Sequence, residues 1–203
     1  MAAASYGKDE RVAEIAVFHS VLGVRPGVLD AARRLTEAGH EVLVADLFEG
    51  EVFDEYEPAM HHAEEVIGHR ELLARAARAT ASLSDGLLTL GFSMGTAPAE
   101  YIALQRGAGT VLFAGAVPLI AFHEDDWPSR VAVQLHGMLS DPWREPHLLE
   151  AFTKEVRACG APCEVYDYPG TGHLFTDASL SAEYDADAAE TAWARVLTFC
   201  ARS

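Results

Sequence analysis

The sequence predicts an α/β fold in which a mostly parallel sheet carries helices on both faces. Short apolar runs alternate with amphipathic stretches along most of the chain, which is the pattern of strand–helix–strand units. Each pair of successive strands is separated by a helix-length connection, as right-handed parallel crossovers require. The chain has 203 residues, half of them hydrophobic, which suits one domain with a full core.

The expected elements follow from apolar periodicity and from the glycines and prolines that end each run. No repeat or linker divides the chain, so we expect a single domain over residues 1–203, with residues 1–12 as a loose tail or an edge element. Strands are expected at residues 14–19, 41–46, 87–90, 110–115, 130–136 and 163–168. Helices are expected at residues 28–38, 59–82 (a stretch that Gly68 can interrupt), 96–105, 146–159 and 187–201.

Composition excludes several classes of protein. The formal net charge of −16 disfavours nucleic acid and anionic membranes as partners, because an acidic surface repels phosphates. Three cysteines without framework spacing (Cys159, Cys163 and Cys200) do not indicate a secreted disulfide scaffold. The sequence shows no signal peptide and no apolar run that could span a bilayer, so we expect a cytoplasmic protein, monomeric or homodimeric.

The most informative stretch is Gly91-Phe92-Ser93-Met94-Gly95, which matches the pattern G-x-S-x-G. The pattern alone arises by chance in many chains. Here it follows a buried strand and precedes a helix, which is the context of a nucleophile elbow. In such an elbow the serine hydroxyl stands clear of the strand end, and small residues are needed where strand and helix approach. We therefore expect Ser93 to be a nucleophile.

A serine hydroxyl needs a base, and the base needs an orienting acid. In enzymes with this elbow, the chain order is serine, then the acid, then histidine. Asp141 follows the strand at residues 130–136 and is the expected acid, although an aspartate before proline is also a common turn cap. His173 follows the last strand and is the expected base. The alternatives are Asp125, Asp126 and Asp167 for the acid and His136 for the base.

The oxyanion that forms during acyl transfer needs two backbone donors. The first is expected to be the N–H of Met94, directly after the nucleophile. The second should come from the loop after the first central strand, where we assign the N–H of Val21 and keep Leu22 as the alternative.

These residues together resemble the dienelactone hydrolase family, a compact branch of the α/β-hydrolases. The resemblance spans residues 15–199 and implies a three-layer α/β-hydrolase fold without a large lid domain. It implies a Ser93–His173–Asp141 triad that hydrolyses an ester or lactone through an acyl-enzyme, with no cofactor and no metal. It rests on Gly23, Pro26-Gly27, Ala38-Gly39-His40, Asp46-Leu47-Phe48-Glu49-Gly50, Gly91-Phe92-Ser93-Met94-Gly95, Gly137 with Asp141, Tyr168, and Gly172-His173-Leu174-Phe175.

The chain departs from the founding members of that family at three positions. Their nucleophile is a cysteine, where this chain has Ser93, and the glutamate that manages the thiol proton is replaced by Ser20. Their arginine after the histidine, which holds a substrate carboxylate, corresponds to Asp177. A neutral or cationic small ester therefore fits better than a carboxylate-bearing dienelactone.

Substrate contacts are expected from loop residues at the rim of the site, namely Leu22, Phe48, Trp143 and Phe175, with Phe53, Phe122 and Trp127 as further aromatic candidates. Two other functions are weighed against hydrolysis. The first is a non-catalytic binding or regulatory protein on the same scaffold, since fold does not dictate function. The second is a metal site on His61, His62, Glu65 and His69, whose spacing is not that of H-E-x-x-H.

Overall fold

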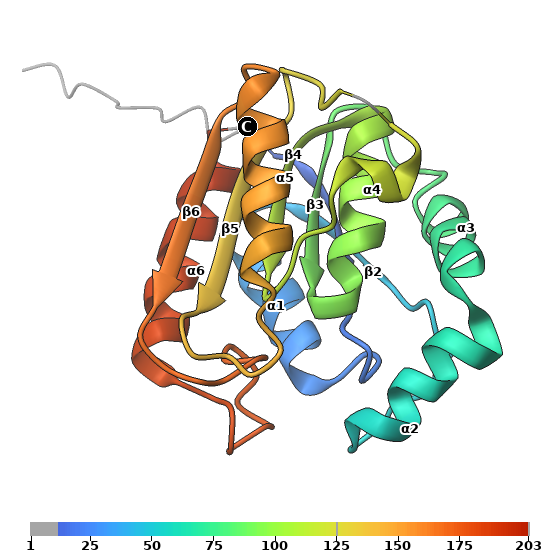
Figure 1. The fold of residues 1–203 in the computed structure, drawn as a ribbon, viewed down its shortest axis with the longest axis vertical. Helices are drawn as coiled ribbons and strands as arrows, with labels where there is room; N and C mark the ends of the chain where they lie inside the picture. The colour runs from blue at the N-terminus through green and yellow to red at the C-terminus, as the bar shows by residue number, and fades with distance from the viewer. Residues whose placement is uncertain (1–11, 125, 203) are drawn as a thin grey trace, which may run out of the picture.

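One parallel sheet organises the chain in this computed structural model, which describes residues 12–124 and 126–202. The sheet has six strands in the order β2-β1-β3-β4-β5-β6, and every neighbouring pair is parallel (Figure 1). The strands are β1 (Glu14–Phe18), β2 (Glu41–Ala45), β3 (Leu87–Phe92), β4 (Gly107–Phe113), β5 (Ala132–Met138) and β6 (Cys163–Tyr168). The chain adds β2 on one side of β1 and then crosses to add β3 to β6 on the other side. The loops that follow β1, β3 and β4 therefore lie close together at the carboxyl ends of these strands.

Helices cover both faces of this sheet, so the molecule has three layers (Figure 1). On one face α1 and α6 lie side by side, joined by an ion pair between Arg34 and Glu190. On the other face α4 packs against β3 and β4, with α3 on one side of it and α5 on the other (Figure 1). The helices are α1 (Pro26–Glu37), α2 (Tyr56–His61), α3 (His69–Ala79), α4 (Thr96–Arg106), α5 (Pro146–Ala158) and α6 (Ala186–Cys200). The predicted fold class is therefore confirmed.

The central strands are apolar because both of their faces are covered. All six residues of β3 are buried, as expected for a strand between two helical layers. The edge strand β6 has five partly buried or exposed positions among its six residues, and its charged residues lie there. Hydrophobic burial thus fixes β3 in the middle of the sheet, directly before the candidate nucleophile.

Most predicted elements lie within a few residues of the observed ones. The strand at residues 163–168 coincides with β6, whereas β4 begins at Gly107, three residues before the expected start. The reason is that α4 ends at Arg106 and leads directly into the strand without a loop. The tail expected at residues 1–12 falls almost wholly outside the described residues, and so does Asp125.

The helical stretch expected at residues 59–82 begins earlier and is interrupted. It consists of α2, a π-helical turn η1 (His62–Ile67) and α3, and Gly68 separates the last two. Gly68 has φ 84° and ψ 149°, a conformation open mainly to glycine, and this bends the chain. The interruption at Gly68 agrees with the sequence analysis. It also directs α2 and η1 away from the sheet, beyond its carboxyl ends (Figure 1).

Among the described residues, no helix is both long and apolar enough to cross a lipid bilayer.

Candidate active site

Ser93 sits in a sharp turn between β3 and α4. Its φ of 51° is left-handed, which is uncommon outside glycine and typical of strained functional positions. The turn η2 (Ser93–Gly95) runs directly into α4, and the hydroxyl of Thr96 caps it by donating to the Ser93 carbonyl at 2.8 Å. The strand, turn and helix expected around Ser93 are therefore all present.

The two glycines of the turn are required by close backbone approaches. A Cβ on Gly91 would overlap the carbonyl of Gly95, and a Cβ on Gly95 would overlap the carbonyls of Phe18 and His19 at the end of β1. Any larger residue would push the turn away from the sheet. The elbow is thus fitted against both its own helix and the neighbouring strand.

The structure brings Ser93, His173 and Asp141 together from the ends of β3, β6 and β5. The Nε2 atom of His173 lies 2.7 Å from the Oγ of Ser93, and Nδ1 lies 2.7 Å from the Oδ2 of Asp141. Because the carboxylate can only accept a hydrogen bond, Nδ1 carries the proton and Nε2 accepts from the serine hydroxyl. This arrangement suits general-base activation of Ser93.

Both partners of this ion pair are themselves held in place. The side chain of Asp141 is 2% exposed, and its second oxygen, Oδ1, accepts the backbone N–H of Trp143 at 2.8 Å. Beyond His173, the carboxylate of Glu183 accepts the backbone N–H of Leu174 and the hydroxyl of Tyr56, at 2.7 and 2.8 Å. Burial and the Glu183 carboxylate raise the pKa of the Tyr56 hydroxyl, so this donor stays protonated.

The predicted oxyanion donors flank Ser93 in the same cleft. Met94 lies in the first turn of a helical segment, where N–H groups have no intrahelical acceptor. The N–H of Leu22 donates to the Oγ of Ser20 at 3.2 Å, whereas that of Val21 makes no hydrogen bond among the described residues. Val21 is therefore the better of the two alternatives for the second donor.

A cleft of about 490 Å³ lies over Ser93, a volume within the usual range for small-molecule sites. Its described lining contains two carboxylates, Glu64 and Glu145, and neither lysine nor arginine. The rings of Tyr56 and Trp143 lie 5.7 Å apart and both approach the ring of His173, at 6.2 and 6.3 Å. The cleft therefore combines aromatic surface with negative charge.

Of the four predicted substrate contacts, only Trp143 lines this cleft, where it is 48% exposed. Leu22, Phe48 and Phe175 are corrections, because all three are buried in the hydrophobic core. Phe48 packs edge-on against His19, with ring centroids 4.7 Å apart, and Phe175 packs against the rings of Phe113 and Tyr168. Among the further candidates, Trp127 is also buried, and neither Phe53 nor Phe122 lines the cleft.

The rival candidates for acid and base lie elsewhere. His136 is buried, donating from Nε2 to the Gln134 side chain at 2.9 Å and pairing through Nδ1 with the hydroxyl of Tyr168 at 2.8 Å. Asp167 forms an ion pair with Arg144, and the exposed Asp126 lies in the loop before β5. None of these side chains lines the cleft over Ser93.

Asp177, at the position of the family's arginine, does not face the cleft. Its carboxylate accepts the N–H and the hydroxyl of Ser179, and it lies 3.9 Å from the Nε of Arg25. No set of three or more histidine, cysteine, aspartate or glutamate side chains in the described chain could hold a metal ion. The structure thus gives no support to a metal site on the helical residues His61, His62, Glu65 and His69.

Several cleft residues were not predicted from sequence. Tyr56, Met60 and Glu64 come from α2 and η1, and Glu145 and Leu148 come from the start of α5. The available signal was the glycine at position 68, which detaches this helical stretch from α3. Nothing in the local sequence shows that the detached part lies over the carboxyl ends of the strands.

Comparison with known proteins agrees with this architecture. The chain matches the dienelactone hydrolase family over residues 1–203. The chain belongs to this family. Membership supports hydrolase activity. None of the curated protein sequences compared with the chain matches it.

Several solved structures share this fold at low sequence identity. One is a dienelactone hydrolase-like promiscuous phosphotriesterase, P91, from metagenomic libraries, with TM-score 0.79 and 23% identity over 97% of this chain and 89% of that one. A second, m3DLH, has TM-score 0.81 and 23% identity over 94% and 86%. A thioesterase domain from the curacin biosynthetic pathway reaches 0.61 and 15% over 93% and 92%. At these identities the likeness concerns the fold.

Proposed function

We propose that this dienelactone hydrolase family member is a serine hydrolase that cleaves small neutral or cationic esters or lactones. The observation that carries the proposal is the continuous hydrogen-bonded chain from Ser93 through His173 to Asp141, with two distances of 2.7 Å. A strained serine backbone at the start of α4 supports the same role for Ser93.

In the proposed mechanism, the Oγ of Ser93 attacks the ester carbonyl while Nε2 of His173 takes the hydroxyl proton. Asp141 holds the imidazole in the required tautomer and stabilises its charged form. The N–H groups of Met94 and Val21 stabilise the oxyanion. When the C–O bond to the alcohol breaks, His173 returns its proton to the leaving oxygen, and an acyl group remains on Ser93.

The second half of the reaction uses water as the nucleophile. His173 accepts a proton from water, the hydroxide adds to the acyl carbon, and the Ser93 oxygen leaves as it regains the proton. The products are a carboxylic acid and the free enzyme. No step of this scheme needs a redox partner or an additional co-substrate.

The preference for neutral or cationic substrates rests on the charge of the cleft. The carboxylates of Glu64 and Glu145 disfavour an anionic ligand, and among the described residues neither lysine nor arginine lines the cleft to offset them. The rings of Tyr56 and Trp143 offer faces on which an ammonium group could rest.

The test is stopped-flow release of p-nitrophenol from p-nitrophenyl acetate by the wild-type protein and by Ser93→Ala. A burst near one equivalent that disappears in the variant would support an acyl-enzyme on Ser93. A folded wild-type sample that reacts neither with this ester nor with a fluorophosphonate would contradict the proposal, and would favour a binding or regulatory role for the scaffold.

A further inference from the structure

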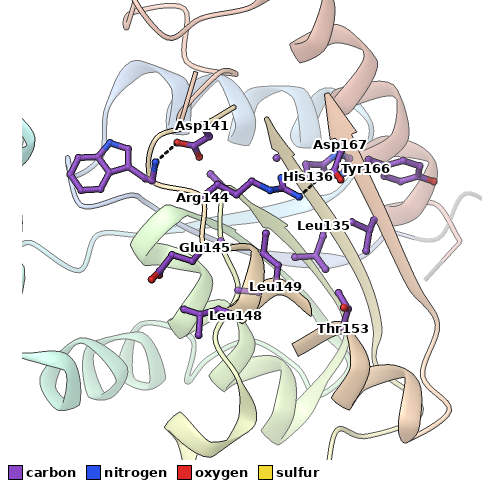
Figure 2. Close-up of a pocket in the computed structure, with 16 residues that line it drawn as sticks. Leu135, His136, Asp141, Arg144, Glu145, Leu148, Leu149, Thr153, Tyr166 and Asp167 are labelled. Atoms are coloured by element: carbon purple, nitrogen blue, oxygen red, sulfur yellow. Dashed lines mark hydrogen bonds and ion pairs between the residues drawn. The ribbon is translucent and has the colours of Figure 1, made fainter. Parts of the chain in front are cut away.

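A second, smaller hollow lies beside the cleft, between α5 and the carboxyl ends of β5 and β6 (Figure 2). Its volume is about 70 Å³. A single water needs roughly 10–15 Å³ by this kind of measure, so the hollow can take a group of several heavy atoms. None of the roles proposed above uses it.

The hollow and the cleft adjoin each other, because several residues line both. Gly115 runs beside the nucleophile, since a Cβ placed on it would lie 3.7 Å from the carbonyl oxygen of Ser93. The flanking residues Ala114 and Ala116 add only one side-chain carbon each, so little side-chain volume stands between the two spaces. Ala114 adopts a φ of 61°, a strained conformation of the kind that concentrates at functional sites. The residues that line both spaces are Ala114, Gly115, Ala116, Trp143, Glu145 and Leu148.

The walls of this side pocket are mostly apolar. Figure 2 shows Leu135 of β5 facing Leu149 of α5, with Thr153 one turn further along the helix. The hydroxyl of Thr153 is already donated to the carbonyl of Glu150, at 3.1 Å. Such walls favour an aliphatic group over a polar one, because a polar group would lose its hydration without gaining partners.

The charged groups at the pocket are engaged or point elsewhere. Arg144 reaches across the strand ends to Asp167 (Figure 2), with Nη2 and Oδ1 2.8 Å apart. It also donates to the carbonyl of Met138 at 3.3 Å. The carboxylate of Glu145 is exposed and points away from Leu135 and Leu149 (Figure 2). A charged ligand group therefore finds no free partner deep in the pocket.

We infer that the side pocket binds a short, unbranched aliphatic group of the ester, of at most about five to seven carbons by the ~10–15 Å³ scale above. The inference rests on the proposed hydrolase function and adds a size limit to it. Leu135, Leu149 and Thr153 set the length of the group that fits. The group can belong to the acyl part or to the alcohol part of the ester, because both parts are attached to the carbonyl carbon that lies over Ser93.

Two substrate series distinguish these sources. The first lengthens the acyl chain from p-nitrophenyl acetate through butyrate to octanoate, and the second lengthens the alcohol from methyl to butyl to octyl acetate. For the wild-type protein we expect kcat/KM to rise towards the four-carbon member of one series and to fall at the eight-carbon member. The series that shows this maximum identifies the part that occupies the pocket.

Leu149→Trp fills the pocket. In the series that shows the maximum, we expect this variant to lower the ratio of kcat/KM for the four-carbon member to kcat/KM for the shortest member by about tenfold or more, because the added chain loses its contacts. Leu149→Ala enlarges the pocket and should move the maximum to a longer chain, which keeps the test valid if the tryptophan variant does not fold. Lys154→Trp adds the same ring to an exposed position of α5, outside the pocket, and should leave the ratio unchanged.

Unchanged ratios in both Leu149 variants, with p-nitrophenyl acetate hydrolysis still dependent on Ser93, would overturn the side-pocket inference and leave the proposed function intact. A flat wild-type profile in both series would overturn it as well. Hydrolysis that persists in Ser93→Ala would overturn the proposed function, and with it the assignment of the pocket to this ester.

Discussion

The Nδ1–H of His19 donates a hydrogen bond to the backbone carbonyl oxygen of Ser20, with the two heavy atoms 2.7 Å apart. The Nε2 atom of the same ring accepts the N–H of Leu47 at 2.9 Å, so the proton must be on Nδ1. In a trans peptide the C=O and the next N–H point in opposite directions. By fixing the Ser20 carbonyl, His19 therefore fixes the direction of the Val21 N–H, which is the candidate oxyanion donor.

We expect His19→Phe to lower kcat by about 10- to 100-fold and to leave KM nearly unchanged, because the oxyanion forms after substrate binds. Phe48→Leu is the control, since it removes the ring against His19 but keeps both hydrogen bonds. Steady-state kinetics on a p-nitrophenyl ester separates the two constants. Equal losses in both variants would indicate a packing role for His19 instead.

Asp141→Asn should lower kcat by about 10³- to 10⁴-fold, because an amide can donate to Nδ1 of His173 and stabilise the wrong tautomer. The backbone N–H of Trp143 retains an acceptor in the variant, so the fold should persist. Single-turnover acylation rates give the measurement. Asp126→Asn, at the exposed rival position, should behave as wild type, and a comparable loss there would argue against Asp141 as the orienting acid.

Neutralising the cleft carboxylates should change selectivity by charge. For Glu64→Gln and Glu145→Gln we expect kcat/KM for a cationic choline-type ester to fall by about two- to fivefold each, with little change for a neutral ester of equal size. The difference should shrink at 1 M salt, where charges are screened within about 3 Å. Glu150→Gln changes an exposed carboxylate of α5 outside the cleft and serves as the control.

Glu100 should make the protein less stable as pH rises. It is fully buried in α4, where Oε1 accepts the N–H of Val117 at 2.9 Å and Oε2 has no hydrogen-bond partner. Burial raises the pKa of this carboxyl well above its usual value. The folded chain thus holds a proton that the unfolded chain releases above about pH 4.3, and stability is lost as pH rises from there towards the raised pKa.

Glu100→Gln cannot ionise and keeps an acceptor for Val117. We expect its free energy of unfolding at pH 8 to exceed that of wild type by about 1 kcal/mol or more, and the difference to vanish near pH 4. Urea unfolding at pH 4, 6 and 8 measures this, with the exposed Glu51→Gln as control. A wild-type profile that runs parallel to the variant would contradict the assignment.

His136 should make the protein less stable as pH falls, the opposite of the effect of Glu100. Burial lowers the pKa of this imidazole to about 3, and the charge of Arg195 adds to the shift. The unfolded chain binds the proton below about pH 6.5, so stability should be lost as pH falls from there towards 3. His136→Phe should be less stable at pH 7 but should lose less stability between pH 7 and 4. The exposed His147→Phe should retain the wild-type slope in urea titrations.

The sequence was sufficient to predict the parallel sheet and the meeting of Ser93, Asp141 and His173, because each follows a strand and parallel strands end at one edge. It was not sufficient for the cleft walls. Leu22, Phe48 and Phe175 are loop or turn residues whose side chains point into the core, and local sequence does not fix that direction. Long-range packing also decides which helix covers the cleft, and hence its charge.

The base, His173, follows β6, which pairs with β5 alone and forms one edge of the sheet. The chemistry of Ser93 at the centre therefore depends on the strand with the fewest neighbours. Detachment of this single strand would remove the imidazole from Ser93 while the other five strands remained paired. Enzymatic turnover should accordingly be lost earlier in a gradual denaturation than the bulk helical signal.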